Sequence, residues 1–312
     1  MVRQVDVAII GGGISGMSAA LSLARQGWKP LVLTGGVLGG QLISIDKVEG
    51  VPGFPDGIPG YDLVPMVQEQ ADAAGAELMM VSCQAIEASA ANWLLKTDED
   101  DVVARAVILA TGAAFARLGL EGEQRFAGKG VSDCASCDGP LLRDKVAVVV
   151  GGGDSALQEA LTLADHASKV VILERSAVLS AQATYQDRIK ANSKIEVRTQ
   201  STVSEIGGND TVSHVRVKDL AAGTETELAT AAVFPFVGLV ANSGLAQNLV
   251  PLDRSGRVIV DAAMRTSARG VCAIGNVRQH ASYRAAGAMG DAAAAAMALD
   301  RYLKSGEWGE AN

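Results

Sequence analysis

Two cysteines separated by two residues form the most reactive pattern in this chain, in the stretch Cys134-Ala135-Ser136-Cys137. At this spacing the two sulfur atoms can join in a small-loop disulfide that opens and closes readily. The same pair could instead form half of a zinc site, which needs a second pair of ligands. The other two cysteines and the three histidines are scattered along the chain. The spacing therefore favours a redox-active dithiol over a metal site.

A glycine-rich loop near the N-terminus fits a phosphate-bearing nucleotide. The loop Gly11-Gly12-Gly13-Ile14-Ser15-Gly16 follows an apolar run at 5–10, which predicts a buried strand, and precedes a helix-forming segment at 17–26. A further strand is expected at 31–33. Strand, G-x-G-x-x-G and helix in that order form the dinucleotide fingerprint. Its glycines let the backbone approach a pyrophosphate at the helix N-terminus.

The same pattern recurs after the dithiol, at Gly151-Gly152-Gly153-Asp154-Ser155-Ala156. A predicted strand at 146–150 precedes this loop, and a helix at about 156–163 and a strand at 169–173 follow it. Ala156 replaces the last glycine and is still small enough for close packing. Two such units predict two nucleotide sites, with Gly151, Gly153, Ser155 and Ala156 as candidate contacts of the second.

The order of these patterns predicts two domains, because 312 residues exceed one ordinary core. Apolar runs at 106–112 and 231–238 are natural exits from one domain into the other. Another strand ending at a glycine is expected at 270–276, before an alanine-rich C-terminal helix. The predicted fold is α/β, with two Rossmann-like three-layer nucleotide-binding domains, the second inserted in the first. The expected boundaries are 1–115 with 242–312 for the outer domain and 117–240 for the nested domain.

Composition and charge exclude several classes of protein. A net charge of −8 argues against binding to nucleic acid or to an anionic membrane. The N-terminus runs straight into a strand pattern, which leaves no room for a signal peptide, and the alanine tract at 292–296 is too short to span a bilayer. Four cysteines make no disulfide scaffold, and Cys83 and Cys272 are expected to be buried thiols. These features predict a cytoplasmic protein.

Taken together, the motifs resemble those of the low-molecular-weight, bacterial-type thioredoxin reductases, over almost the whole chain. These are FAD-dependent pyridine nucleotide-disulfide oxidoreductases. The resemblance rests, beyond the two loops, on Thr34-Gly35-Gly36-Val37-Leu38-Gly39-Gly40-Gln41, Val51-Pro52-Gly53-Phe54-Pro55, Ala110-Thr111-Gly112-Ala113 and Cys134-Ala135-Ser136-Cys137-Asp138-Gly139. It implies a homodimer, FAD in the outer domain, a nicotinamide site in the nested domain, and a rotation between the domains during turnover.

The resemblance also implies roles for particular residues. Cys137 would lie nearest the flavin, Cys134 would attack the partner's disulfide, and Asp138 would protonate a departing thiolate. The alternative for Asp138 is an Asx-type turn before the following glycine. The implied contacts of FAD are Gly11, Gly13, Gly16, Thr34, Gly39, Gly40, Gln41, Thr111, Gly112, Asn276, Arg284 and Ala285.

The nested domain departs from the family where NADPH is bound. NADPH-using relatives place several arginines after the second strand of this domain, but here only Arg175 remains, and Ser176 and Ser180 fill the other matching positions. Glu174 stands at the strand end, where a carboxylate would accept hydrogen bonds from a ribose 2′-hydroxyl and repel a 2′-phosphate. NADH is therefore favoured over NADPH. The alternative is an exposed Glu174–Arg175 pair in a site that has lost nucleotide selectivity or binding.

The outer domain departs from the family at Asn276, which replaces an aspartate that holds the ribityl chain of the flavin. The amide can still accept a hydrogen bond, and the loss of a negative charge should make the reduced flavin slightly easier to form. Gly50 replaces an asparagine, and the segment 277–282, which includes His280, is one residue longer than usual. His280 could face the flavin, but a position at the surface is expected.

The expected activity is the transfer of electrons from a nicotinamide, through FAD and the dithiol, to a disulfide. The substrate would be a thioredoxin-like protein or a small disulfide or dithiol. Two enzymatic alternatives remain: a flavin dithiol oxidase that passes electrons to oxygen, and a reductase fed by a ferredoxin or a flavodoxin. A non-catalytic flavin-binding redox sensor is a further alternative, against which the intact Cys134, Cys137 and Asp138 argue.

Overall fold

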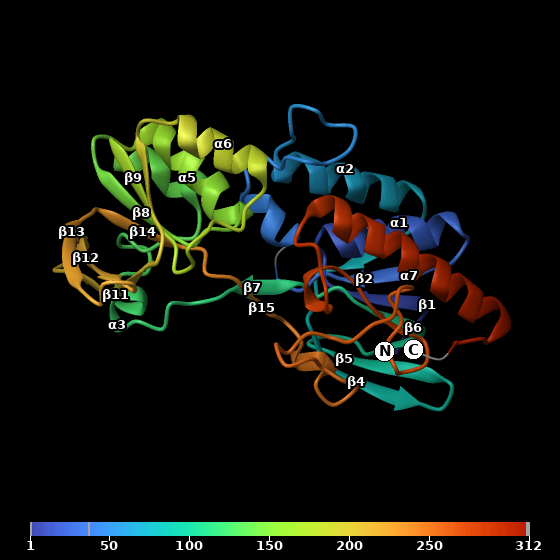
Figure 1. Cartoon of the computed structure of the whole chain (residues 1–312). Coiled ribbons are helices and arrows are strands. Elements are labelled where there is room, and N and C mark those ends of the chain that lie inside the picture. The colour runs from blue at the N-terminus through green and yellow to red at the C-terminus, as the bar shows by residue number, and fades with distance from the viewer. Residues whose placement is uncertain (1, 37, 310–312) are drawn as a thin grey trace. The chain divides into compact units, whose positions relative to one another are not determined.

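The computed structural model describes residues 2–36 and 38–309 (Figure 1). Val37 of the second motif, and the first residue and residues 310–312 of the predicted outer domain, lie outside the described residues. The chain divides into two compact units, unit 1 with residues 1–114 and 240–312, and unit 2 with residues 115–239. The predicted domain boundaries lie close to this division.

Unit 1 is built on a seven-stranded sheet with the order β3-β2-β1-β6-β5-β4, in which β16 also pairs with β6. The parallel strands are β1 (Arg3–Ile10), β2 (Pro30–Leu33), β3 (Glu77–Met79), β6 (Val102–Leu109) and β16 (Val271–Ala273). An antiparallel part is added by β4 (Cys83–Ser89) and β5 (Asn92–Thr97). The carboxyl-terminal halves of β1 and β6 are fully buried, as expected of parallel strands covered on both faces.

Three long helices belong to unit 1: α1 (Ile14–Arg25), α2 (Gly60–Ala73) and α7 (Ala285–Ser305). α1 packs against both α2 and α7. Ala292, Ala295 and Ala296 of α7 are fully buried, so the alanine tract serves close helix packing. No helix in the described part of the chain is long and apolar enough to cross a membrane. The described part of this unit also has three short 3-10 helices, η1 (Gly40–Ser44), η3 (Gly244–Ala246) and η4 (Gly275–Val277).

Unit 2 contains a parallel sheet and an antiparallel sheet. The parallel sheet has the order β10-β9-β8-β14 and consists of β8 (Val146–Val150), β9 (Lys169–Leu173), β10 (Ile195–Arg198) and β14 (Ala232–Pro235). The antiparallel sheet consists of β11 (Ser201–Gly208), β12 (Val212–Asp219) and β13 (Glu225–Ala229). The helices are α3 (Glu121–Arg125), α4 (Ala135–Asp138), η2 (Gly139–Leu142), α5 (Asp154–His166) and α6 (Ala183–Ala191).

The alternating side chains of β8 join the three layers of unit 2. Val149 packs with α5 and α6 in one hydrophobic core, whereas Val148 and Val150 pack with β11 and β12 in another. A strand that is buried on both faces needs such a continuous apolar sequence. The predicted α/β architecture, with one unit inserted in the other, is therefore what the chain forms.

Several predicted elements differ from the observed ones at their ends. The helix expected at about 156–163 extends over α5, two residues earlier and three later. The run at 231–238 forms a strand only at β14, and the run at 106–112 ends as a strand at Leu109. Strand β16 also stops early, because Gly275 turns the chain with a φ of +69°. Where the chain passes between the units, β7 (Ala113–Phe115) pairs with β15 (Leu239–Ala241).

Candidate active site and nucleotide-binding loops

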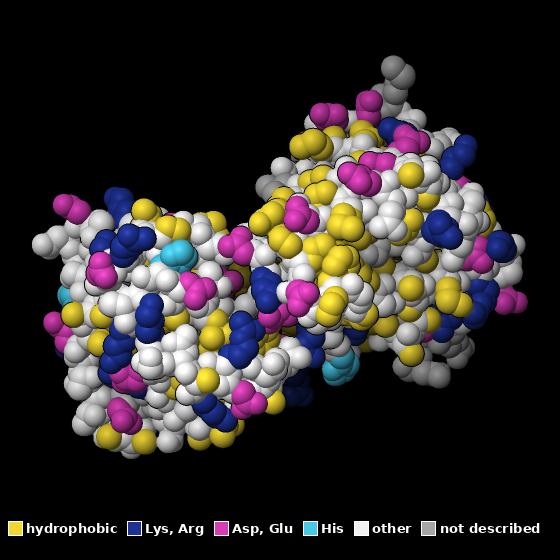
Figure 2. Space-filling view, turned by 90° about the horizontal axis from the view of Figure 1, so that it is seen from above, with side chains coloured by type: hydrophobic (Ala, Val, Ile, Leu, Met, Phe, Trp, Pro, Cys, Tyr) yellow, Lys and Arg dark blue, Asp and Glu magenta, His cyan; other side chains and the backbone are white. Residues whose placement is uncertain are grey.

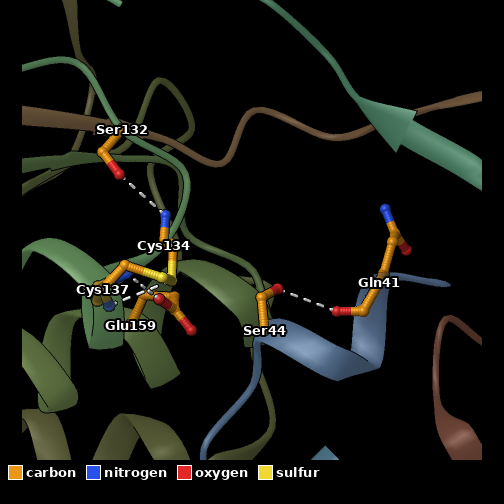
Figure 3. The surroundings of a disulfide bond; sticks show 7 residues. Gln41, Ser44, Ser132, Cys134, Cys137 and Glu159 are labelled. Carbon is orange, nitrogen blue, oxygen red and sulfur yellow. Dashed lines mark hydrogen bonds between the residues drawn. A yellow bond between two sulfur atoms is a disulfide. The ribbon is translucent and has the colours of Figure 1, made fainter. Parts of the chain in front are cut away.

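The dithiol lies at the start of α4 in unit 2, where Cys134 and Cys137 form a disulfide with their Cα atoms 5.3 Å apart (Figure 3). Cys134 caps the helix, since its Sγ accepts a hydrogen bond from the Cys137 amide at 3.2 Å. The Cys134 amide in turn donates to the Ser132 hydroxyl at 3.1 Å. Cys134 is half-buried and Cys137 is exposed. Both sulfur atoms therefore lie at the first turn of α4.

Asp138 is the last residue of α4, and its amide donates to the Cys134 carbonyl at 3.2 Å. Within the described residues its side chain accepts no backbone hydrogen bond of the kind that defines an Asx turn. The carboxyl group is half-buried beside the two sulfur atoms along the chain. Its role in proton transfer to a thiolate stays a prediction.

The remaining cysteines offer no second redox pair. Cys272 is fully buried as predicted, and desolvation raises the pKa of its thiol. Cys83 is only half-buried, contrary to expectation, and desolvation raises the pKa of its thiol to about 11. Both thiols are therefore protonated at neutral pH and poorly nucleophilic. Among the described residues, no group of three or more His, Cys, Asp or Glu side chains is placed to hold a metal ion.

The loop between β8 and α5 has the geometry of a phosphate-binding turn. Gly151 has a φ of +128°, and a Cβ atom there would lie 2.2 Å from the Phe236 carbonyl oxygen. Gly153 is the N-cap of α5, and the nearest atom to a Cβ placed there is Ser180 Oγ at 3.8 Å. Ser155 is exposed on the first turn, and Ala156 is buried against Gly151. The loop is thus closed by packing on its inner side and open on its outer side.

Glu174 follows β9 and places its carboxylate over this loop. Its Oε1 accepts a hydrogen bond from the Ser176 amide at 2.7 Å. A Cβ atom at Gly152 would lie 2.6 Å from its Oε2, so the carboxylate touches the loop directly. Ser180 is also beside the loop, with its amide donating to the Gly152 carbonyl at 2.9 Å, while Arg175 is exposed. A nucleotide seated on the loop would meet an anionic group there.

The loop between β1 and α1 in unit 1 repeats this construction. Gly11 has a φ of +120°, and a Cβ atom there would lie 2.3 Å from the Ala110 carbonyl oxygen. At Gly16 a Cβ atom would lie 2.0 Å from the Gly11 carbonyl oxygen. At Gly13 the nearest atom to such a Cβ is 4.0 Å away, on Gly40, so this side of the loop is open. The Gly39 amide closes the far side by donating to the Gly12 carbonyl at 3.0 Å.

An unpaired buried donor supports a ligand site next to this loop. Gln41 lies in η1, where the Ser44 hydroxyl donates to its carbonyl at 3.2 Å (Figure 3). Its Nε2 is buried and has no hydrogen-bond partner among the described residues, while its Oε1 accepts from Asn276 Nδ2 at 3.3 Å. Burying an amide nitrogen without a hydrogen-bond acceptor costs free energy, and a bound ligand that supplies the acceptor would remove this cost. A flavin nucleotide, with hydroxyl and phosphate oxygens, fits this donor set.

A buried ion pair that the sequence did not reveal holds Asn276 in place. Asp291 of α7 accepts from the Gly275 amide at 3.0 Å and pairs with Arg278 at 2.6 Å. Arg257 donates to the Asn276 carbonyl at 3.0 Å. The single acidic residue within an alanine-rich segment was the signal that could have identified Asp291.

The other candidate FAD contacts also lie in unit 1. Thr34 is buried at the end of β2, and Thr111 donates to the Asn242 carbonyl at 2.7 Å next to Gly112, which has a φ of +68°. Arg284 caps α7 and Ala285 begins it. His280 is exposed, as predicted. The fold therefore gathers the flavin candidates in one unit and the dithiol and the second loop in the other.

Comparison with known proteins agrees with this arrangement. The family described as pyridine nucleotide-disulphide oxidoreductase matches residues 5–297. A thioredoxin reductase of Mycolicibacterium smegmatis is 39% identical over 299 residues, covering 96% of each chain. That of Treponema pallidum is 37% identical over 303 residues, covering 97% of this chain and 98% of the relative. A plant protein named NADPH-dependent thioredoxin reductase 3, from Arabidopsis thaliana, is 40% identical over 96% of this chain, which spans only 58% of the plant protein.

Solved structures give the same result. The thioredoxin reductase of Lactococcus lactis has a TM-score of 0.93 at 35% identity, covering 96% of this chain and 99% of the other. That of T. acidophilum has a TM-score of 0.92 at 33% identity, covering 97% and 100%. The predicted fold class, two Rossmann-like domains within a mixed α/β fold, is confirmed by these matches.

Proposed function

Because the chain belongs to the pyridine nucleotide-disulphide oxidoreductase family, and within it to the low-molecular-weight thioredoxin reductases, we propose that it reduces thioredoxin with electrons from a nicotinamide cofactor. The observation that carries this proposal is the Cys134–Cys137 disulfide, placed in the same unit as the second nucleotide loop. Enzymes of this family use FAD and a nicotinamide. A dithiol that opens and closes is what the transfer of two electrons to a partner disulfide requires.

FAD is the cofactor of unit 1 in this proposal. Gly11, Gly13 and Gly16 would admit its pyrophosphate, and Gln41 Nε2 would donate to it. When bound, FAD would supply two-electron redox chemistry between the nicotinamide and the disulfide. The protein should purify yellow with about one FAD per chain. A colourless protein that takes up no added FAD would contradict the proposal.

In unit 2, Cys137 would receive the electrons and Cys134 would attack the disulfide of thioredoxin. Asp138 would hold the proton for the departing thiolate. Cys137→Ser and Cys134→Ser should each abolish disulfide turnover and leave FAD bound, because both sulfur atoms are needed to close the disulfide. Full activity of either variant with thioredoxin would show that the redox pair is elsewhere.

The nicotinamide donor is proposed to be NADH. The support is the Glu174 carboxylate, which touches Gly152 at the place where a ribose 2′-hydroxyl would need an acceptor. The plant relative is named NADPH-dependent, so the chain would differ from it in this respect. Anaerobic stopped-flow mixing with each nucleotide tests the proposal, and rapid bleaching of the flavin by NADH with slower bleaching by NADPH is expected. Faster bleaching by NADPH would contradict it.

A homodimer formed through unit 1 is part of the same proposal. On α2 and α7, Tyr61, Met66 and Met297 are exposed by 50%, 44% and 61%. Figure 2 shows hydrophobic side chains gathered on the face of unit 1 that this view presents. Gathered apolar side chains are typical of an interaction surface. Light scattering of the FAD-loaded protein should give twice the chain mass, and Met297→Glu should lower it towards one chain.

A further inference from the structure

A buried carboxylate lies next to the dithiol segment. Glu159 of α5 is only 9% exposed, and its Oε2 accepts a hydrogen bond from the Ala135 amide at 2.8 Å. Ala135 directly follows Cys134 and is fully buried. Figure 3 shows the Glu159 side chain reaching the segment that carries the disulfide. Burying a carboxylate costs free energy even when it is hydrogen-bonded, so packing alone does not account for this residue.

The surrounding face of α5 is otherwise apolar. Leu157, Ala160 and Leu163 of α5 are fully buried in the same hydrophobic core as Ala135. Glu159 is the acidic exception on this face. The same helix begins at the phosphate loop, so one rigid element carries both the loop and the contact to the dithiol.

This hydrogen bond changes the surroundings of Cys134 once the disulfide opens. A thiolate at Cys134 would still accept from the Cys137 amide, which is 3.2 Å from its Sγ in the disulfide form. The Ala135 amide is the next backbone donor, but Glu159 occupies it. The carboxylate is hydrogen-bonded to the residue that directly follows Cys134, so it also brings a like charge towards a thiolate there. Both effects disfavour a thiolate at this position.

Other ionisable groups around α4 make no comparable contact. In unit 2, α4 packs against α5 and η2, and η2 has no ionisable side chain. Asp133 pairs with Arg117 at 3.9 Å, and the His166 ring lies against Gly139 beyond the second cysteine. Among the described residues, Glu159 is the ionisable side chain that accepts a hydrogen bond from the backbone between the cysteines. The acidic and histidine side chains on α4 and α5, or directly before α4, are Asp133, Asp138, Asp154, Glu159, Asp165 and His166.

Resting on the proposed function, we propose that Glu159 is a positioning residue that makes the Cys134–Cys137 pair a stronger reductant. It fixes the backbone at Ala135 and destabilises the reduced form of the pair relative to the disulfide. The pair therefore gives its electrons to a partner disulfide more readily than it would with a neutral residue at this position. The direction of electron flow is in this way built into unit 2 itself.

The reaction that Glu159 favours is a thiol–disulfide exchange between the pair and a partner protein. The Cys134 thiolate attacks one sulfur of the partner's disulfide, forms a mixed disulfide and releases the other partner sulfur. The Cys137 thiolate then attacks Cys134 Sγ, restores the Cys134–Cys137 bond and releases the second partner sulfur. The two released thiolates take up the two protons that the cysteine thiols gave up. The pair is oxidised by two electrons, and the partner is reduced to a dithiol.

Glu159→Gln tests the proposal, because glutamine keeps a hydrogen-bond acceptor of the same size and removes the charge. The FAD-loaded full chain would be equilibrated without oxygen in dithiothreitol redox buffers, quenched with a thiol-specific mass tag and counted by mass spectrometry. The equilibrium constant for reducing the disulfide should rise about tenfold, which equals about 30 mV for two electrons. A change of less than twofold would overturn the proposal.

Glu123→Gln is the matched control. Glu123 is also a buried glutamate of unit 2, 5% exposed, and its Oε2 accepts from the Gly119 amide at 3.0 Å. It lies on α3, which packs with the antiparallel sheet rather than with α4. The equilibrium constant of this variant should stay unchanged. An equal rise in both variants would mean that a general loosening of unit 2 is responsible, and would also overturn the proposal.

A second readout separates charge from structure. With Cys137→Ser as background, the alkylation rate of Cys134 would be followed against pH, and Glu159→Gln should move its midpoint about one pH unit lower. Glu159→Asp keeps the charge, so its midpoint should stay within half of that shift. Should Glu159→Gln fail to fold, Glu159→Asp still tests the proposal, since a midpoint lowered by a full unit there would contradict the role of the charge.

These outcomes are distinct from those for the proposed function. If the exchange equilibrium shifts as expected but the protein does not reduce thioredoxin, the proposed substrate is wrong and the role of Glu159 stands. If thioredoxin is reduced but neither equilibrium nor midpoint moves in Glu159→Gln, the role of Glu159 is wrong.

Discussion

The two glycine loops of this protein have the same construction and different surroundings. In unit 1 a Cβ atom at Gly11 would lie 2.3 Å from the Ala110 carbonyl oxygen, and in unit 2 a Cβ atom at Gly151 would lie 2.2 Å from that of Phe236. Both glycines have φ values near +120°. The second glycine of each loop, however, faces different side chains. Gly12 lies against Cβ and the methyl group of Thr34, whereas Gly152 lies against the Glu174 carboxylate.

The glycines meet the steric needs of a phosphate loop, whereas the residue beside them can determine which nucleotide binds. The glycines are required because the loop backbone must turn sharply against the next strand. The residue after the second strand is not constrained in this way, since only its side chain lies against the second glycine of the loop. A neutral threonine in one unit and a glutamate in the other therefore predict two different nucleotides on one scaffold.

The largest expected effects come from replacing the first glycine of each loop. Alanine at a positive φ costs about 1–3 kcal/mol, and the overlap with a carbonyl oxygen costs about as much again. Gly11→Ala should lose most of its FAD, while Gly151→Ala should keep FAD and lose reduction by nicotinamide. The ratio of flavin to protein absorbance and stopped-flow bleaching measure the two effects.

Gly290→Ala is the control for these variants, because a Cβ atom at Gly290 has open space and its φ is not positive. It should keep both functions and gain about 0.5–1 kcal/mol in the free energy of unfolding. If Gly151→Ala loses FAD instead, the assignment of the two loops to two different nucleotides fails.

The next effect concerns the strand-end residue of unit 2. Glu174→Gln combined with Ser176→Arg and Ser180→Arg should move the preference towards NADPH, because charge-assisted hydrogen bonds of about 1.5–3 kcal/mol would then reach the 2′-phosphate. An increase of about two decades in affinity for NADPH is expected, measured as the concentration dependence of flavin bleaching. Glu174→Gln alone is the matched control and should mainly weaken NADH. Unchanged affinities in the triple variant would show that this segment does not contact the nucleotide.

A smaller effect is expected at the neutral site of unit 1. Asn276→Asp would place a carboxylate next to Gln41, as Glu174 places one beside Gly152 in unit 2. A nearby negative charge disfavours the anionic reduced flavin, so the midpoint potential should fall by about 30 mV, which is 1.4 kcal/mol for two electrons. Equilibration with a reference dye measures this potential. A potential that rises would contradict the placement of Asn276 beside the flavin.

The smallest effect is electrostatic and confined to the sheet that supports the unit 2 loop. Hydrogen bonds from Arg198 and Lys169 lower the pKa of Glu196 on β10. A lowered folded-state pKa contributes stability above the unfolded-state pKa, and this contribution disappears as the pH falls through the folded-state value. Because the groups are partly exposed, Glu196→Gln should cost no more than about 1 kcal/mol at pH 7. Urea unfolding at pH 7 and pH 3 checks this, with a smaller difference between variant and parent expected at pH 3.

Much of the site could be predicted from the sequence because it depends on local geometry. The glycine loops at Gly11 and Gly151 follow from the steric demands of a strand–turn–helix unit, which involve neighbours along the chain. The pairing of Cys134 with Cys137 follows from their spacing, because two intervening residues let the two sulfur atoms meet in a small loop. The ends of α5 and of the strand after Ala106 were missed by a few residues, because packing and positive φ values decide where an element stops.

The tertiary structure alone decided which distant groups meet. Glu159 contacts Ala135 across 24 residues, and Asn276 contacts Gln41 across 235. Neither pairing leaves a periodic signal, since it depends on how α5 packs against α4 and on how the strand ends of unit 1 converge. The sequence by itself determined the chemistry of the dithiol and the two loops, because short-range sterics specify them. Only the folded chain decided the charge beside the dithiol and the partner of Asn276, because long-range packing brings those residues together.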